Sequence, residues 1–161
     1  MNMPHIHELI DFTVEVFIVN KNKVLLRKHD KYNIWLSVGG HVELNEDPNK
    51  AAIREVKEEV GLDINLVPSS LILKTDKEKY EHLIAPVFMN KHKINEKHEH
   101  ITLVYFAKSN SNKIKQGGKE ISKDCKWFSL EDLESLKENI SETVKIYAKT
   151  ALNFLGENDN K

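Results

Sequence analysis

The chain has 161 residues, of which 40% are hydrophobic and 30% are charged, a composition typical of one globular domain with an ordinary core. Its formal net charge of −1 argues against a general electrostatic attraction to nucleic acid or to an acidic membrane surface. The only cysteine, Cys125, excludes an intrachain disulfide, and no apolar run approaches the roughly 20 residues needed to span a bilayer.

These features predict a cytoplasmic protein that forms a single domain over residues 1–161. Residues Met1 to Asp11 lack the basic start and the apolar run of a signal peptide. We expect residues 1–10 to form an N-terminal arm and residues 156–161 to form a frayed tail. Cys125 is expected to be a small buried residue rather than a reactive thiol.

The first strands are predicted to form a hairpin. Residues Phe12–Val19 are rich in β-branched and aromatic residues, and Val24–Leu26 follow after a polar turn. A further short strand, Ile34–Val38, ends at a double glycine, Gly39 and Gly40.

A helix over Pro48–Val60 is predicted because both of its ends carry capping signals. Asp47 suits the N-cap, Pro48 suits the first helical position, and Gly61 suits the left-handed position that follows a helix. The apolar stripe expected to face the core consists of Ile53, Val56 and Val60.

The second half of the chain is predicted to contain more strands and two further helices. The expected strands are Ile64–Leu73, His82–Met89, Ile101–Ala107 and Cys125–Phe128. Ser129 opens a short helix through Leu136, and a last helix from about Ser141 to Leu155 carries an apolar stripe of Val144, Tyr147, Ala151 and Leu155. Because one helix interrupts a majority of strands, the predicted fold class is α/β, a mixed β-sheet with helices on its faces.

Three glutamates of the first helix fall on one side of it. At about 100° per residue, Glu55, Glu58 and Glu59 lie within roughly a third of the helix circumference. Such carboxylates repel one another unless positive charge lies among them, and Arg54 is placed to pair with Glu58. The ordinary interpretation of a glutamate cluster is a solvated surface.

Three features favour a binding site instead. The double glycine before the helix lets backbone atoms approach a ligand closely. The glutamates converge rather than alternate with lysines, and Arg54, one of the only two arginines with Arg27, lies beside them. Converging carboxylate oxygens suit a hard cation such as Mg²⁺, which takes further ligands from substrate phosphates.

The stretch from Gly40 to Leu62 resembles the Nudix box, G-x5-E-x7-R-E-U-x-E-E-x-G-U, where U is a bulky aliphatic residue. All nine defined positions agree: Gly40, Glu46, Arg54, Glu55, Val56, Glu58, Glu59, Gly61 and Leu62. Val38 stands where many members have proline, a position that shapes the turn. The resemblance implies a Nudix α/β/α sandwich with its catalytic helix at about 48–60 and hydrolysis of a pyrophosphate linkage with Mg²⁺, or with Mn²⁺ as the alternative ion.

The resemblance also implies roles for individual residues. Glu58 and Glu59 are expected to bind the metal with the carbonyl of Gly39 or Gly40, and Glu55 to share in metal binding or orient the attacking water. Glu46 and Arg54 are expected to form a supporting ion pair. A further carboxylate is assigned to Glu120 ahead of Glu99. The general base is left open among Glu58, Glu55 and Glu120.

Several residues are candidates for substrate binding, each with a structural alternative. Arg27 is expected to contact a phosphate or to form a surface salt bridge. Glu15 is expected either to bind a base or a sugar hydroxyl, or to face solvent. Trp35 and Tyr32 stack on a base or pack in the core. His41 is close enough to the double glycine to reach phosphate.

His98 and His100 alternate around Glu99 and can point to one face of a strand. A zinc site there is disfavoured because no cysteine or third spaced ligand accompanies them in sequence.

The expected substrate is a small nucleoside diphosphate derivative: a nucleoside triphosphate, a nucleotide sugar or a dinucleotide. No nucleic-acid or membrane partner is expected, and the oligomeric state is left open, with a homodimer as one alternative. Two rival functions are a catalytically silent nucleotide-binding domain, disfavoured by the complete set of glutamates, and an isopentenyl-diphosphate-isomerase-like enzyme, disfavoured because Cys125 lies in no matching motif.

Overall fold

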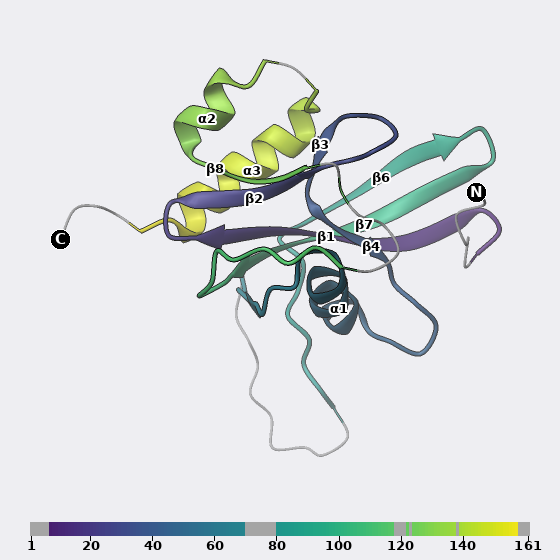
Figure 1. Cartoon of the computed structure of the whole chain (residues 1–161). Helices are drawn as coiled ribbons and strands as arrows, with labels where there is room; N and C mark the ends of the chain where they lie inside the picture. The colour runs from purple at the N-terminus through teal and green to yellow at the C-terminus, as the bar shows by residue number, and fades with distance from the viewer. Residues whose placement is uncertain (1–6, 70–79, 118–121, 123, 138, 158–161) are drawn as a thin grey trace.

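A mixed β-sheet with helices on both faces forms the centre of the molecule (Figure 1). The computed structural model describes residues 7–69, 80–117, 122, 124–137 and 139–157. The predicted α/β architecture, including the helix at 48–60, is confirmed. None of the helices in this described part of the chain is long and apolar enough to cross a membrane.

The described residues form strands and helices in the following order along the chain: β1 (Ile10–Asn20), β2 (Lys23–Lys28), β3 (Trp35–Leu36), β4 (Val38–His41), α1 (Pro48–Val60), β5 (Asn65–Leu66), β6 (Phe88–Asn95), β7 (His98–Lys108), β8 (Asp124–Phe128), α2 (Leu130–Ser135) and α3 (Glu142–Leu155).

Strand β1 organises the sheet because it pairs with three other strands. It runs parallel to β7 from Ile10↔Glu99 to Val19↔Lys108. The middle of β1 also pairs antiparallel with β4, and its end forms the predicted hairpin with β2. Strand β2 in turn pairs with β3 and β8, and β7 pairs with β5 and β6.

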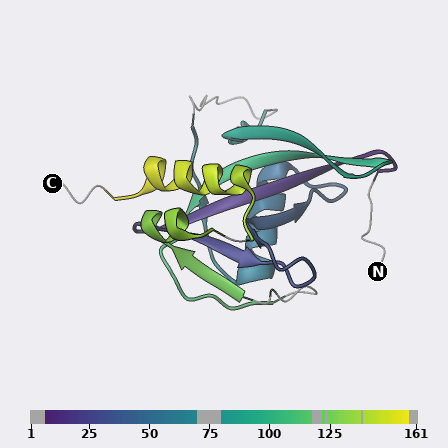
Figure 2. The same cartoon turned by 90° about the horizontal axis from the view of Figure 1, so that it is seen from above.

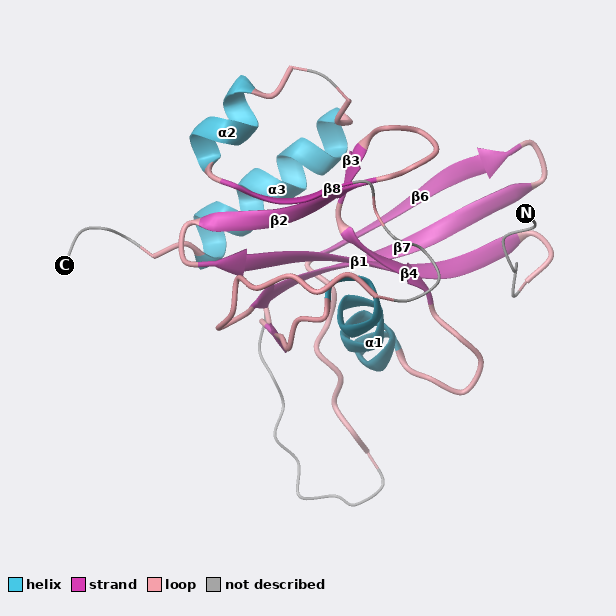
Figure 3. Ribbon diagram, viewed as in Figure 1, coloured by secondary structure: helices cyan, strands magenta, loops and turns pink. Residues whose placement is uncertain are grey.

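Two apolar layers lie on the two faces of this sheet. Because side chains alternate along a strand, Val14, Val16 and Ile18 of β1 pack with α1 on one face. Phe17 and Val19 pack with α2 and α3 on the other. Figures 1 and 3 show α1 on one side of the sheet and α2 with α3 on the other, and Figure 2 views the molecule from the side of α2 and α3.

Helix α1 begins and ends where its capping residues predicted. The Asp47 carboxylate accepts hydrogen bonds from the backbone N–H groups of Asn49 and Lys50, and Gly61 adopts the left-handed conformation with φ of 68°. The buried face differs from the prediction, since Ala51, Ala52, Val56 and Val60 face the sheet. Ile53 is 46% exposed, because the two small alanines allow α1 to lie close to the sheet on that side.

The predicted strands of the middle segment are partly wrong. Only Asn65–Leu66 of the expected strand Ile64–Leu73 pairs with the sheet, and residues 70–73 lie outside the described part. Residues 82–87 form no strand; the strand β6 instead covers Phe88–Asn95. The sequence from Asn90 to His100 is polar and carries little strand signal, but pairing with β7 supplies its hydrogen bonds.

Substituting Gly61 tests the end of α1. A Cβ at this position would lie 2.7 Å from the carbonyl oxygen of Lys115, and the φ of 68° disfavours side chains with a Cβ. We expect Gly61→Ala to lower the free energy of unfolding by at least ~1–2 kcal/mol in urea denaturation. Gly61→Asn has the same Cβ but tolerates this φ better, so a smaller loss for Asn would show the share due to backbone conformation. A Gly61→Ala protein as stable as the original would contradict this account.

Candidate active site

The double glycine of β4 lets the sheet approach the acidic side of α1. Gly40 pairs with Val14 of β1, and a Cβ added to Gly40 would lie 2.5 Å from Oε1 of Glu55. A Cβ on Gly39 would lie 2.0 Å from the carbonyl oxygen of Val14. Side chains at either position would therefore push α1 and its glutamates away from the sheet.

The guanidinium of Arg54 ties the loop before α1 to the glutamates. It donates two hydrogen bonds to Glu46, from Nη2 at 2.7 Å and from Nε at 3.1 Å. Its Nη1 donates to Glu55 at 2.9 Å and to Glu58 at 3.2 Å, while Nη2 also donates to the carbonyl of His41 at 2.9 Å. The ion pair expected between Glu46 and Arg54 is present, and Arg54 also contacts two of the three glutamates of α1.

The carboxylates around Arg54 differ in their electrostatic environment. Hydrogen bonds from the Arg54 guanidinium hold the pKa of Glu46 below its ordinary value. Burial raises the pKa of Glu55 despite the nearby Arg54. The Glu58 side chain is 54% exposed, so its carboxylate points toward solvent, where a ligand can reach it.

The third glutamate, Glu59, is held by a second arginine. Its Oε1 lies 3.0 Å from Nη2 of Arg27, and its Oε2 accepts a hydrogen bond from the backbone N–H of Gly39 at 3.1 Å. Arg27 is buried and also donates through Nε to the carbonyl of Ser37. The salt bridge expected as the alternative is therefore present, but it is buried and does not lie on the surface.

One of the two expected alternatives for Glu15, a side chain that faces solvent, is wrong. It lies on the face of β1 opposite α1, half-buried, and accepts a hydrogen bond from the side chain of Ser37. Burial raises its pKa more than this hydrogen bond lowers it. Sequence reasoning missed Ser37, although its position directly before the paired strand β4 was a signal that it lies near the glycines.

Trp35 belongs to the core and offers no exposed ring for stacking. It is 6% exposed, and its ring meets Phe128 edge-on at 4.9 Å between centroids. Its expected role in substrate stacking is therefore wrong, because β3 pairs with β2 and turns the indole toward the layer under α2 and α3. Tyr32 is exposed and lies beside the ring of His29.

The two candidates for the distal carboxylate have different outcomes. Glu120 lies outside the described residues. Glu99 lies on β7 and pairs with Lys91 of β6 at 2.9 Å. Half-buried Cys125, on β8 opposite Arg27, has its pKa raised by burial, which agrees with an unreactive thiol.

The donor set around Arg54 fits a hard divalent cation. Glu55, Glu58 and Glu59 offer only carboxylate oxygens, and the glycine backbone approaches them closely. In the described structure, Arg54 and Arg27 supply the positive charge that keeps these carboxylates together. A cation with phosphate ligands would supply further positive charge at the same carboxylates.

Replacing Arg54 tests its importance for the loop and helix. Lysine keeps the charge but cannot form the forked contacts, so we expect Arg54→Lys to lower the free energy of unfolding by about 1–3 kcal/mol. Urea denaturation at neutral pH measures the effect. As a control, Lys149→Met removes an exposed pair with Glu134 at 3.5 Å and should change stability by less than ~1 kcal/mol. Equal losses in both variants would contradict a special role for Arg54.

Glu15 should destabilise the fold at neutral pH. Its pKa is raised in the folded state, so the unfolded chain loses this proton first and stability falls as pH rises above the ordinary value of 4.5. We expect Glu15→Gln to raise the melting temperature at pH 7, with the gain disappearing at pH 4 and below. Exposed Glu131→Gln serves as the control. A gain that persists unchanged at pH 4 would rule out ionisation as its cause.

Comparison with known proteins agrees with the geometry. The family model described as NUDIX domain matches residues 11–149. A crystal structure of a NUDIX-family hydrolase from Clostridium perfringens has a TM-score of 0.79 and 39% sequence identity, covering 90% of this chain and 97% of that chain. The structure of the Escherichia coli dihydroneopterin triphosphate pyrophosphohydrolase, with a TM-score of 0.64 and 17% identity, covers 91% and 99% and shows the shared fold.

A curated relative, dihydroneopterin triphosphate diphosphatase from Haemophilus influenzae, is 40% identical over 86 residues. The alignment covers 53% of this chain and 53% of that protein, so the chain spans about half the length of this relative. Since the family model extends over most of the chain and a family structure aligns along almost its whole length, the chain belongs to the Nudix hydrolase family of enzymes.

Proposed function

We propose that this protein is a Mg²⁺-dependent hydrolase that cleaves a pyrophosphate linkage in a nucleoside diphosphate derivative. The observation that carries the proposal is the arrangement of Glu55 and Glu58 around Arg54, beside the glycine backbone of β4. An acidic surface without function would not need a half-buried glutamate, a forked arginine and two glycines at one place.

The residues of the site are proposed to have different roles in hydrolysis. Bound Mg²⁺ neutralises phosphate oxygens and lowers the pKa of coordinated water. Glu55, Glu58 and Glu59, with the Gly40 carbonyl, would hold the cation, and Glu58, Glu55 or Glu120 would accept the proton of the attacking water. Glu46 orients Arg54, which keeps the carboxylates in place without touching the substrate. Glu120 remains the proposed distal carboxylate.

The residues proposed to bind the substrate lie on strands β1, β2 and β4. Glu15 lies on β1 beside the double glycine and is proposed to lie near the nucleoside part, whereas the ring of His41 is turned toward Asp11. The Gly39 backbone is proposed to approach the phosphates closely. Arg27 is proposed to contact a phosphate after Glu59 turns toward the cation, since a guanidinium released from its carboxylate is well suited to phosphate.

The named relatives direct the choice of substrates. The Haemophilus relative acts, by its name, on dihydroneopterin triphosphate. We therefore place dihydroneopterin triphosphate and nucleoside triphosphates, including oxidised ones, ahead of nucleoside diphosphate sugars and dinucleoside polyphosphates.

The experiment is a measurement of phosphate and pyrophosphate release across these four substrate classes with Mg²⁺, and with Mn²⁺ as the alternative ion. We expect turnover of one class, which Glu58→Gln lowers by about 10²–10⁴-fold and which EDTA abolishes. Glu96→Gln, in the turn between β6 and β7, should keep full activity. Folded protein that binds nucleotide without turnover would point to the silent binding domain instead.

Glu55→Gln and Glu59→Gln separate the roles of the glutamates. A residue that only holds the cation should mainly raise the Mg²⁺ concentration required for half-maximal rate. A residue that accepts the proton should lower kcat at saturating Mg²⁺. An unchanged Mg²⁺ requirement and an unchanged kcat in all three glutamine variants would overturn the assignment of this site.

A further inference from the structure

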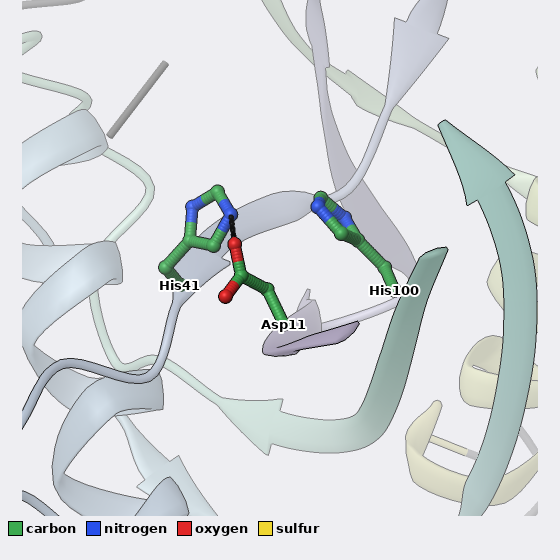
Figure 4. Close-up of side chains that lie close together, drawn as sticks. All are labelled: Asp11, His41 and His100. Carbon is green, nitrogen blue, oxygen red and sulfur yellow. Dashed lines mark ion pairs between the residues drawn. The ribbon is translucent and has the colours of Figure 1, made fainter. Parts of the chain in front are cut away.

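A second group of ligating side chains lies away from the glutamates. Asp11 of β1, His41 of β4 and His100 of β7 place one carboxylate oxygen and two imidazole nitrogens within 4.8 Å of one another (Figure 4). In Figure 4 the Asp11 carboxylate lies between the two rings. The three strands therefore bring together residues that lie 30 or more positions apart in sequence.

The sheet register explains why these residues meet. Asp11 pairs directly with His100 in the parallel β1–β7 ladder, and Thr13 pairs with His41 in the antiparallel β1–β4 ladder. Residues two apart on a strand share a face, so Asp11, His41 and His100 all lie on the face opposite α1. The box glutamates on α1 lie on the other side of the sheet.

His98 joins the same group. It lies two residues before His100 on β7, is buried, and places its Nε2 3.2 Å from Oδ2 of Asp11. The Nε2 of His41 lies 3.4 Å from that same oxygen. The other carboxylate oxygen, Oδ1, accepts a hydrogen bond from the backbone N–H of His7 at 2.7 Å. One oxygen of Asp11 is thus held by the backbone while the other faces the imidazoles.

Because this group is buried, the hydrogen bonds and ligands of its side chains have a large effect on stability. Asp11 is 0% exposed and His100 is 6% exposed, so water does not solvate them well. Among the residues that the structure describes, the buried Nε2 of His100 has no hydrogen-bond partner. A buried polar nitrogen without a partner destabilises the fold, and a ligand at this position would remove that cost.

The buried Nε2 of His100, which has no hydrogen-bond partner within the described part of the chain, can present a lone pair to a ligand. On His98, Nδ1 lies 3.4 Å from the carbonyl oxygen of Glu8, so this imidazole lies between that carbonyl and Asp11. A cation between the lone pair of His100 and the carboxylate of Asp11 would complement both.

The spacing also suits a transition metal. Four ligands at about 2.0–2.1 Å from a tetrahedral ion lie about 3.3 Å from one another. The separation of 3.4 Å between Oδ2 of Asp11 and Nε2 of His41 agrees with this value. Imidazole nitrogens favour Zn²⁺ and its neighbours over Mg²⁺, which prefers oxygen.

We propose that Asp11, His41 and His100 bind Zn²⁺ at a site separate from the glutamates of α1, with His98 beside Asp11 as a positioning residue. Three protein ligands leave the fourth position of a tetrahedral coordination sphere for water. The site joins the start of β1, the end of β4 and the start of β7. His41 also accepts a hydrogen bond from Arg54 through its carbonyl, so the bound ion steadies the strand end that leads into the acidic loop.

Metal binding is measured on the full-length, tag-free, metal-depleted chain with Co²⁺ as the spectroscopic probe and with Zn²⁺ by calorimetry. We expect one tightly bound ion per chain and the intense visible absorption of tetrahedral Co²⁺, displaced by Zn²⁺. His41→Gln and His100→Gln should each weaken Zn²⁺ binding by at least ~100-fold, and Asp11→Asn should alter the Co²⁺ spectrum. His29→Gln, beside Tyr32 and away from the site, is the matched control.

The variant Glu55→Gln/Glu58→Gln distinguishes the two sites and is expected to keep the Co²⁺ spectrum and the Zn²⁺ affinity. Loss of both in this variant, with His41→Gln unchanged, would assign the ion to the glutamates and overturn the proposal. Failure of folded wild-type chain to bind Zn²⁺ at micromolar concentration would overturn it as well. Because His41 is only half-buried, His41→Gln should fold, which circular dichroism checks. None of these measurements depends on hydrolysis.

Discussion

The guanidinium of Arg54 is the interaction on which the acidic site depends. Glu55 and Glu58 follow it on α1, and Glu46 lies across from it in the preceding loop, so three carboxylates converge at short range. Their mutual repulsion would spread the loop and the helix apart if no cation lay among them. Only arginine can contact all three and still donate to the His41 carbonyl, because its donors point in several directions within one plane.

The double glycine leaves the space that Glu55 needs when Arg54 holds it against β4. Arg54 can hold Glu55 against β4 only because Gly40 has no side chain to occupy that space. In the same strand, the Gly39 N–H donates to Glu59, which Arg27 holds from the opposite direction. The two arginines therefore position different glutamates, one through the loop and one through the sheet. This explains why a chain otherwise rich in lysine has arginine at these two positions.

The sequence was sufficient for the parts of the fold that depend on neighbours in the chain. Asp47, Pro48 and Gly61 marked both ends of α1, and Ser129 marked the start of α2. The sequence was insufficient where the contacting residues lie far apart along the chain. The strand β6 has a polar sequence and exists because β7 offers it hydrogen bonds, and the exposure of Ile53 follows from how closely Ala51 and Ala52 approach the sheet. Helical periodicity alone does not predict how closely a helix packs against the sheet.

The two polar sites differ in how far apart their residues lie in the sequence. The glutamates of α1 lie within one helix, so their spacing in sequence predicts their convergence, and the contact of Glu46 with Arg54 spans only one loop. Asp11 and His100 are 89 positions apart and meet through the β1–β7 register. A search for closely spaced ligands therefore finds the pair His98 and His100 and misses the others. The sheet places the glutamates of α1 on one face and the imidazoles with Asp11 on the other, so the two proposed cation sites would differ in their ligand chemistry.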